Sequence, residues 1–241
     1  MIFNNLNNRN DTNGAFFRFN NKKKKDFDYS SYKGWTSLEV LKFKINKNKT
    51  FSKFFFDKFF KEKNKKIEYN FIHLNGNLNF KINNKTLKLS KKFDTLTINS
   101  LNDFDLKTSK NSTFYLIKSK NKILKKTIKK FNFLNSRNVK KRDLWGGQCI
   151  SRVYEGKNTT IVLFKLKKNF KFHDNGHANE QITWVINGSM NFYCGKKHKK
   201  LNVTNGVDVG KFQKHGGIAN KAMGFDVFFP KRSEKRYKEK I

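Results

Sequence analysis

Proline, cysteine and acidic residues are scarce in this chain of 241 residues. Pro230 is the single proline, and the two cysteines, Cys149 and Cys194, are too few for a disulfide framework and are not spaced as zinc ligands. No apolar run reaches the roughly 18 residues that a transmembrane helix needs. The opening segment MIFNNLNNRNDTNG lacks the charged flank and apolar centre of a signal peptide. We therefore expect a protein of the reducing cytoplasm without membrane contact, long enough to bury a substantial core.

The scarcity of acidic residues leaves a strong positive charge. There are 54 Lys and Arg residues against 18 Asp and Glu, a formal net charge of +36. Such an excess is typical of proteins that bind nucleic acid or anionic membranes. Here it is mostly lysine, spread along the whole chain with many Asn, Ile and Phe residues, which share AT-rich codons. We attribute much of the charge to codon bias and expect no nucleic-acid partner, with polyanion binding as the alternative.

Apolar and polar residues alternate in short runs from about residue 35 onward, as in LEVLKFKI (38–45). Alternation with a period of two marks half-buried β-strands. Asn-Gly or Asn-Asn pairs at 75–76, 83–84 and 187–188 predict tight hairpin turns. A helical period occurs only weakly, over residues 121–135. The chain is therefore expected to be all-β, an antiparallel sandwich or barrel.

The sequence contains an internal repeat. NGNLNF (75–80) matches NGSMNF (187–192), an offset of 187 − 75 = 112. At the same offset Glu68 matches Glu180. The repeat predicts two copies of one all-β unit.

These copies define the expected domain organisation. A polar tail or loosely docked arm covers residues 1–28. A first lobe without metal covers residues 29–120, and a short helical connector covers residues 121–142. A second lobe, residues 143–241, carries the candidate metal site.

The densest group of metal-binding side chains is FHDNGHANEQITWVINGSMNF (172–192). His173 and His177 precede Glu180 and Gln181. Imidazoles close to a carboxylate or carboxamide are ligands for a divalent transition metal. On a continuous strand His177 and Gln181 share parity and point to one face, whereas Glu180 points to the other unless a bulge shifts the register.

Two segments resemble the motifs of the cupin superfamily. HANEQITWVINGSMNF (177–192) resembles the first motif, a histidine pair followed by Glu or Gln and a strand ending in Gly. NGVDVGKFQKHGGIANKAMGFDVFFPKR (205–232) resembles the second motif, with its single histidine. The resemblance is close from about residue 145 to 232, and the first copy matches in pattern only. It implies two tandem jelly-roll β-barrel lobes, as in the bicupin 5-deoxyglucuronate and 5-keto-4-deoxyuronate isomerases.

The resemblance also implies a ligand set. His177 corresponds to the second histidine of the pair, Gln181 to the Glu/Gln ligand and His215 to the histidine of the second motif. The family's first histidine would stand at Asn175, so His173 is the candidate substitute. We expect these residues to hold one divalent transition metal, Mn, Fe, Co, Ni or Zn.

Two neighbouring residues have alternative interpretations. Glu180 is either a further ligand or an outward structural carboxylate, and Tyr193 is either a proton donor to the substrate or a packing residue. In the first copy, Lys65, Tyr69 and Asp103 stand at the ligand positions, so that copy is expected to be structural.

A metal-dependent enzyme for a small polar carbonyl or carboxylate compound is the implied function, with isomerisation of a sugar acid as the leading reaction. The alternatives are a dioxygenase or lyase acting on a small organic acid, and a non-catalytic cupin that binds or senses a ligand. The apolar face of Ile182, Trp184 and Ile186 predicts packing against the other lobe or against a second subunit in a homodimer.

Overall fold

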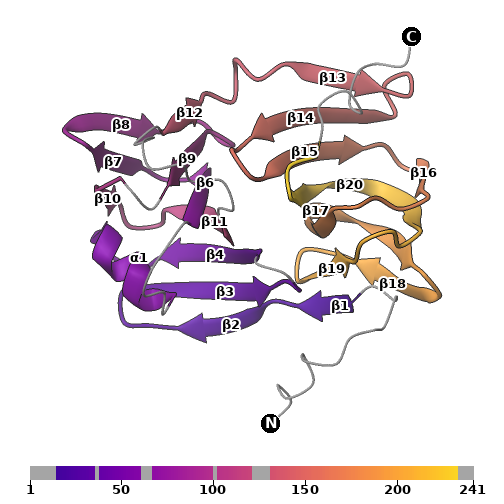
Figure 1. Ribbon diagram of the computed structural model, residues 1–241, viewed down its shortest axis with the longest axis horizontal. Coiled ribbons are helices and arrows are strands. Elements are labelled where there is room, and N and C mark those ends of the chain that lie inside the picture. Colours follow the sequence, from indigo (N-terminus) through magenta and orange to yellow (C-terminus); the bar gives the residue numbers. More distant parts are fainter. Residues whose placement is uncertain (1–14, 36–37, 61–66, 100–101, 121–130, 233–241) are drawn as a thin grey trace.

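The computed structural model describes residues 15–35, 38–60, 67–99, 102–120 and 131–232 (Figure 1). Their strands form three antiparallel sheets of nine, seven and four strands, and none of the three closes on itself within these residues. The helix α1 (Lys53–Phe59) is the one helix among them. No helix in the described ranges has the length and apolar character that crossing a membrane requires. The expected predominance of β-strands is confirmed over the described residues.

The nine-stranded sheet contains all but one of the described strands of the C-terminal half, and takes one strand from the N-terminal half. β16 pairs with β20 and β18 pairs with β17, beside the main path. The strands along that path, followed by these two, are β1 (Ala15–Arg18), β19 (Asn205–Val209), β17 (Glu180–Cys194), β20 (His215–Phe229), β15 (Thr160–Leu166), β14 (Cys149–Glu155), β13 (Lys141–Leu144), β16 (Lys171–Asp174) and β18 (Lys197–Leu201).

Two further sheets build the N-terminal half, at the left of Figure 1. The seven-stranded sheet runs β12 (Asn132–Leu134), β9 (Thr95–Asn99), β6 (Ile67–Asn75), β11 (Thr113–Lys120), β4 (Glu39–Ile45), β3 (Phe27–Lys33) and β2 (Asn20–Lys23). The four-stranded sheet runs β5 (Lys49–Ser52), β10 (Phe104–Thr108), β7 (Leu78–Ile82) and β8 (Lys85–Leu89).

The stretch expected to be a tail or arm forms strands over its described part. β1 pairs with β19, with Ala15 opposite Asp208, and β2 pairs with β3. Phe17 is buried, and its ring stacks on that of Tyr32. Residues near the start of the chain therefore complete the sheet formed by its C-terminal half.

The expected helical connector falls partly on residues 121–130, which lie outside the described residues. The described remainder contains strands β12 and β13 rather than a helix. β12 joins the seven-stranded sheet and β13 is an edge of the nine-stranded sheet.

The three Asn-containing pairs behave differently. Pairs 75–76 and 83–84 form turns that separate β6, β7 and β8, and Asn83 and Asn84 have the positive φ values, 45° and 68°, of a type I′ hairpin. Asn187-Gly188 lies inside β17, where the register against β20 shifts on either side of Asn187. The predicted turn there is wrong, and the pair forms a β-bulge. Gly188 has φ of 75°, and a Cβ at this position would collide with the carbonyl oxygen of Lys221.

Aromatic rings fill the interior of the N-terminal half. One buried cluster draws side chains from both of its sheets, and Phe43 stacks on Phe114 with ring centroids 5.0 Å apart. Tyr69, at one of the positions that correspond to a ligand, is fully buried within this cluster. Asp103, at another, is exposed, and Lys65 lies outside the described residues.

A second cluster joins the two halves. Ile182 and Trp184 of β17 are fully buried there together with Ile72 and Tyr115 of the seven-stranded sheet. The ring centroids of Trp184 and Tyr115 are 5.2 Å apart. The apolar face recognised in the sequence therefore packs against the other half of the same chain.

The two glutamates aligned by the repeat make matching contacts across this junction. Glu68 Oε2 accepts the backbone N–H groups of Lys157 (2.8 Å) and Asn158 (3.0 Å). Glu180 Oε1 accepts the backbone N–H of Trp35 at 2.6 Å. Each half thus binds a loop of the other half through the glutamate at the equivalent position of the repeat.

Candidate metal centre

Three potential ligands converge on the nine-stranded sheet. One ligand atom each from Asp174, His177 and His215 lies within 4.8 Å of the others. The β16–β20 ladder sets Asp174 directly opposite His215. His177 comes from the loop before β17, where Gly176 has φ of 105° and a Cβ would lie 2.5 Å from the backbone of Phe212. A glycine is therefore required for this loop to bring His177 to the strands.

Backbone carbonyls fix the tautomers of both histidines. His177 Nδ1 lies 2.9 Å from the carbonyl oxygen of Asn179, and His215 Nδ1 lies 2.8 Å from that of Gln213. A carbonyl oxygen only accepts hydrogen bonds, so each Nδ1 carries the proton. Each ring therefore presents an unprotonated Nε2, as a metal ligand must.

Burial keeps both rings neutral. Burial, reinforced by the positive charge of Arg232, lowers the pKa of His177 from 6.5 to about 4. Burial likewise lowers the pKa of His215. At neutral pH both Nε2 lone pairs are available.

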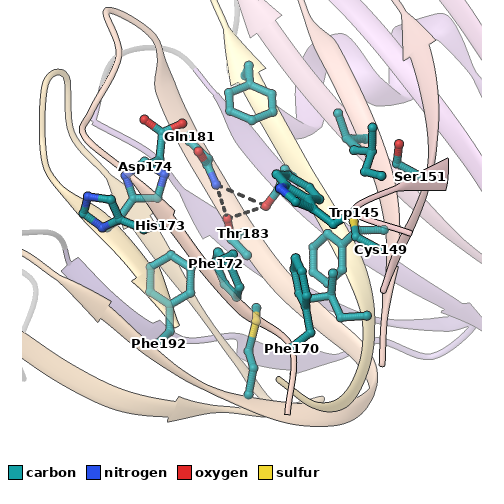
Figure 2. A pocket seen from close by; sticks show the side chains of 18 of the residues that line it. Trp145, Cys149, Ser151, Phe170, Phe172, His173, Asp174, Gln181, Thr183 and Phe192 are labelled. Atoms are coloured by element: carbon teal, nitrogen blue, oxygen red, sulfur yellow. Dashed lines mark hydrogen bonds between the residues drawn. The ribbon is translucent and has the colours of Figure 1, made fainter. Parts of the chain in front are cut away.

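The carboxamide of Gln181 has a fixed orientation. Its Nε2 donates to Thr183 Oγ1 at 2.8 Å and to Asp226 Oδ1 at 3.2 Å, and Thr183 Oγ1 donates to the same carboxylate oxygen at 2.6 Å (Figure 2). Thr183 and Asp226 are direct partners in the β17–β20 ladder. The amide oxygen of Gln181 must therefore face the other way, toward His177.

Two lone pairs consequently face one another. Gln181 Oε1 lies 2.8 Å from His177 Nε2, and neither atom carries a proton at neutral pH. Such a contact is unfavourable unless a cation lies between the two acceptors. Neighbouring ligands at bonds of about 2.1 Å and right angles are about 3 Å apart. Two imidazole nitrogens, an amide oxygen and a carboxylate thus fit a divalent transition metal.

Asp174 is held ionised beside the histidines. Burial raises the pKa of this carboxyl group, but the hydrogen bonds from Arg232 Nη2 to Oδ2 (2.9 Å) and from the Gly176 N–H to Oδ1 (2.9 Å) outweigh it and bring the pKa down to about 2. The Arg232 guanidinium carbon also lies 4.8 Å from the ring centre of Phe228. Arg232 thereby adds a fixed positive charge next to the cluster.

Three of the five residues expected to bind metal, His177, Gln181 and His215, come together. Glu180 and His173 are not in the cluster, although His173 lines the adjoining cavity. The ring of His173 bonds to the Tyr193 hydroxyl and, at 2.8 Å, to Asn175 Oδ1, and it is exposed. Glu180 is directed to the opposite face of β17, toward Trp35. Asp174 places a carboxylate oxygen within the cluster in their stead.

The loop between β16 and β17 explains the difference. His173 was expected to substitute for the histidine missing at position 175, but residues 175–179 lie outside both strands and turn His173 away from the cluster. β16 therefore presents Asp174 to the cluster and His173 to Tyr193. Tyr193 itself is not among the residues that line the adjoining cavity.

A cavity of about 360 Å³ opens beside the cluster (Figure 2). At one end lie Asp174, Gln181, His215 and Arg232. Asp226 also faces it, and burial raises the pKa of that carboxyl group to about 6 against the hydrogen bonds that favour its charge. The apolar lining is made by Leu144, Trp145, Val162, Phe164, Leu166, Phe170, Phe172, Met190, Phe192 and Phe228.

Solved structures match this architecture over most of the chain, although no protein-family model and no curated protein matches the sequence. Protein Ylba from E. coli gives a TM-score of 0.71 at 12% identity, covering 93% of this chain and 95% of that chain. HEPD from Streptomyces albus, with 2-hydroxyethylphosphonate and Fe(II) bound, gives 0.68 at 7%, covering 94% and 78%. A cupin 2 conserved barrel domain protein from Leptotrichia buccalis gives 0.57 at 13%, covering 87% and 91%. The chain has a cupin fold.

The cupin resemblance is thereby confirmed for the fold. Identities of 7–13% carry no activity with them, so the bicupin arrangement and the isomerase reaction stay predictions.

The sequence analysis missed three residues of this candidate site. Asp174 was not among the expected ligands, and Arg232 appeared only as the last residue of the second motif. Asp226 is a lone acid in the apolar strand segment FDVFF (225–229). That isolated charge was the available signal, because a buried carboxylate needs a partner.

Proposed function

We propose that this cupin protein is a metal-dependent enzyme that acts on a small carbonyl or carboxylate compound. His177 Nε2, His215 Nε2, Gln181 Oε1 and a carboxylate oxygen of Asp174 hold one divalent transition metal. The observation that carries the proposal is the 2.8 Å contact between the two lone pairs of His177 and Gln181. The Fe(II) named in the HEPD structure supports the same class of metal.

Bound there, the metal supplies Lewis acidity to a carbonyl or carboxylate oxygen. Arg232, hydrogen-bonded to Asp174, orients an anionic group of the substrate at the same end of the cavity. Asp226 accepts a hydrogen bond from the amide nitrogen of Gln181 and so keeps the amide oxygen directed toward His177. The apolar lining keeps water from the reacting atoms.

The reaction class has three candidates. Isomerisation needs no oxygen, whereas a dioxygenase consumes it, and a lyase releases a fragment. Oxygen uptake measured with Fe(II)-loaded protein separates the first two. A non-catalytic cupin would bind ligand without turnover. We also propose that the two halves are the two copies of a bicupin, since the aligned Glu68 and Glu180 make equivalent contacts.

Metal analysis tests the proposal. Purified protein, stripped with chelator and reloaded with Mn, Fe, Co, Ni or Zn, should retain one metal per chain. His177→Ala combined with His215→Ala should abolish retention, and His198→Ala, an exposed histidine outside the cluster, should not. Retention by the double variant, or its absence in the unaltered protein, would contradict the assignment.

A further inference from the structure

The end of the cavity remote from Arg232 offers little to a polyhydroxylated ligand. Its walls carry the rings of Phe164 and Phe170. The polar groups of Gln181, Thr183 and Asp226 are engaged with one another. Each sugar hydroxyl buried here would lose water without gaining a partner, which disfavours binding.

Ser151 is a single polar anchor within this apolar region. It lines the cavity from β14, it is only 2% exposed, and its hydroxyl oxygen has no hydrogen-bond partner among the described residues. β14 lies three strands from β17 along the sheet, so Ser151 and Thr183 belong to well-separated strands of the cavity wall. Figure 2 shows Ser151 and Asp174 on opposite sides of the lining.

Trp145 stands at the cavity with most of its side chain in solvent. It is 62% exposed, although its ring lies 5.5 Å from that of Phe170 and it lines the cavity. Its φ of 58° is rare for a bulky residue and begins a turn with Gly146 and Gly147. A strained, exposed tryptophan at a cavity is a feature of binding sites rather than of packing.

We propose that the ligand of this centre is a small aromatic acid whose flat ring lies against Trp145 and Phe170. Its carboxylate or carbonyl group meets the metal and Arg232, and one polar ring substituent reaches Ser151. The contact of the ligand's carboxylate or carbonyl group with the metal rests on the proposed function. The preference for an aromatic ring rests on the cavity walls.

Calorimetric titration with phenylpyruvate and with glucuronate tests the aromatic half. In metal-loaded protein, phenylpyruvate should bind at least about tenfold more tightly. The preference should persist in metal-free protein, where both dissociation constants rise. Loss of metal binding with the preference intact would contradict only the proposed function. Equal or tighter binding of glucuronate would overturn the ligand class.

Variants locate the ring and its substituent. Trp145→Ala should raise the dissociation constant for phenylpyruvate on the order of tenfold and remove any change in tryptophan fluorescence on binding. Phe54→Ala, an equally exposed aromatic on α1, should change neither. Ser151→Ala should abolish tighter binding of 4-hydroxyphenylpyruvate relative to phenylpyruvate. An unchanged affinity in Trp145→Ala would refute the stacking.

Discussion

The carboxamide of Gln181 has only one orientation that satisfies its neighbours. Asp226 accepts from both Gln181 and Thr183, so the amide nitrogen is directed away from His177. Because the amide nitrogen is hydrogen-bonded, the amide oxygen is already oriented to bind a cation in the metal-free protein. Asp226 therefore acts on the metal through Gln181, as a positioning residue.

Asp226→Asn should weaken metal binding about 10- to 100-fold, since an asparagine can offer its NH₂ to Gln181 and release the amide to rotate. Chelator competition measures this change. The variant should keep its fold, because the amide is isosteric with the carboxylate. Asp208→Asn provides a buried carboxylate control on neighbouring β19. Equal metal affinity in both variants would contradict a positioning role.

Metal binding should be insensitive to pH over an unusually wide range. With the pKa of His177 lowered to about 4, protons do not compete for its Nε2 between pH 8 and about 6, and burial lowers the pKa of His215 in the same direction. Two histidines of ordinary pKa would instead lose about 100-fold in affinity per pH unit below their pKa. Chelator competition at several pH values distinguishes these profiles, and a steep loss that begins at pH 6.5 would contradict the low pKa values.

The residues of the candidate site could be predicted from the sequence only where their spacing follows a motif. His177, Gln181 and His215 stand at motif positions, and the structure brings them together. The sequence could not show whether Asp174 or His173 reaches the cluster, because that depends on the path of residues 175–179 between the two strands. That path depends on Gly176 and on its tight approach to the backbone of Phe212.

At the scale of elements, exchanged loops hold the two halves together. A Cβ on Gly156 would lie 2.5 Å from Glu68 Oε1, and one on Gly34 would lie 2.5 Å from Glu180 Oε1. Each loop thus needs glycine to approach the glutamate of the other half. Alternation in the sequence predicted the strands, but nothing local encodes these contacts between distant segments.

Glu180→Ala should lower the free energy of unfolding by about 2–3 kcal/mol, because it removes the charged acceptor of the half-buried Trp35 N–H. The variant should still bind one metal per chain. Denaturant unfolding and metal analysis on the same sample test both statements. Asp103→Ala, which removes an exposed acid, is the control for stability. Loss of metal binding in Glu180→Ala would instead support the interpretation of Glu180 as a metal ligand.

At the scale of the whole molecule, the segment at 15–18 joins the sheet that carries the candidate site. Phe17 contributes the largest part of its anchorage, since its ring is 8% exposed and stacks on Tyr32 at an interplanar angle of 9°. Low hydrophobicity and a lysine run made this region resemble a tail. A strand of four residues gives too short a periodic signal to be recognised without its partner.

Phe17→Ala should reduce the free energy of unfolding by about 3 kcal/mol through the lost burial and the cavity left behind. Chemical denaturation followed by far-UV circular dichroism measures it. Phe54→Ala, at 73% exposure, should cost less than about 0.5 kcal/mol. Equal effects of the two substitutions would show that β1 contributes nothing to the sheet.

The pairing of β1 with β19 also delays the completion of the sheet during biosynthesis. Ala15 meets Asp208, a separation of 208 − 15 = 193 residues, so β1 leaves the ribosome long before its partner has been translated. Its unpaired backbone groups must wait through most of synthesis, exposed to other nascent chains. Expression yield should therefore depend on translation speed and chaperone supply more strongly than the stability of the finished protein would suggest.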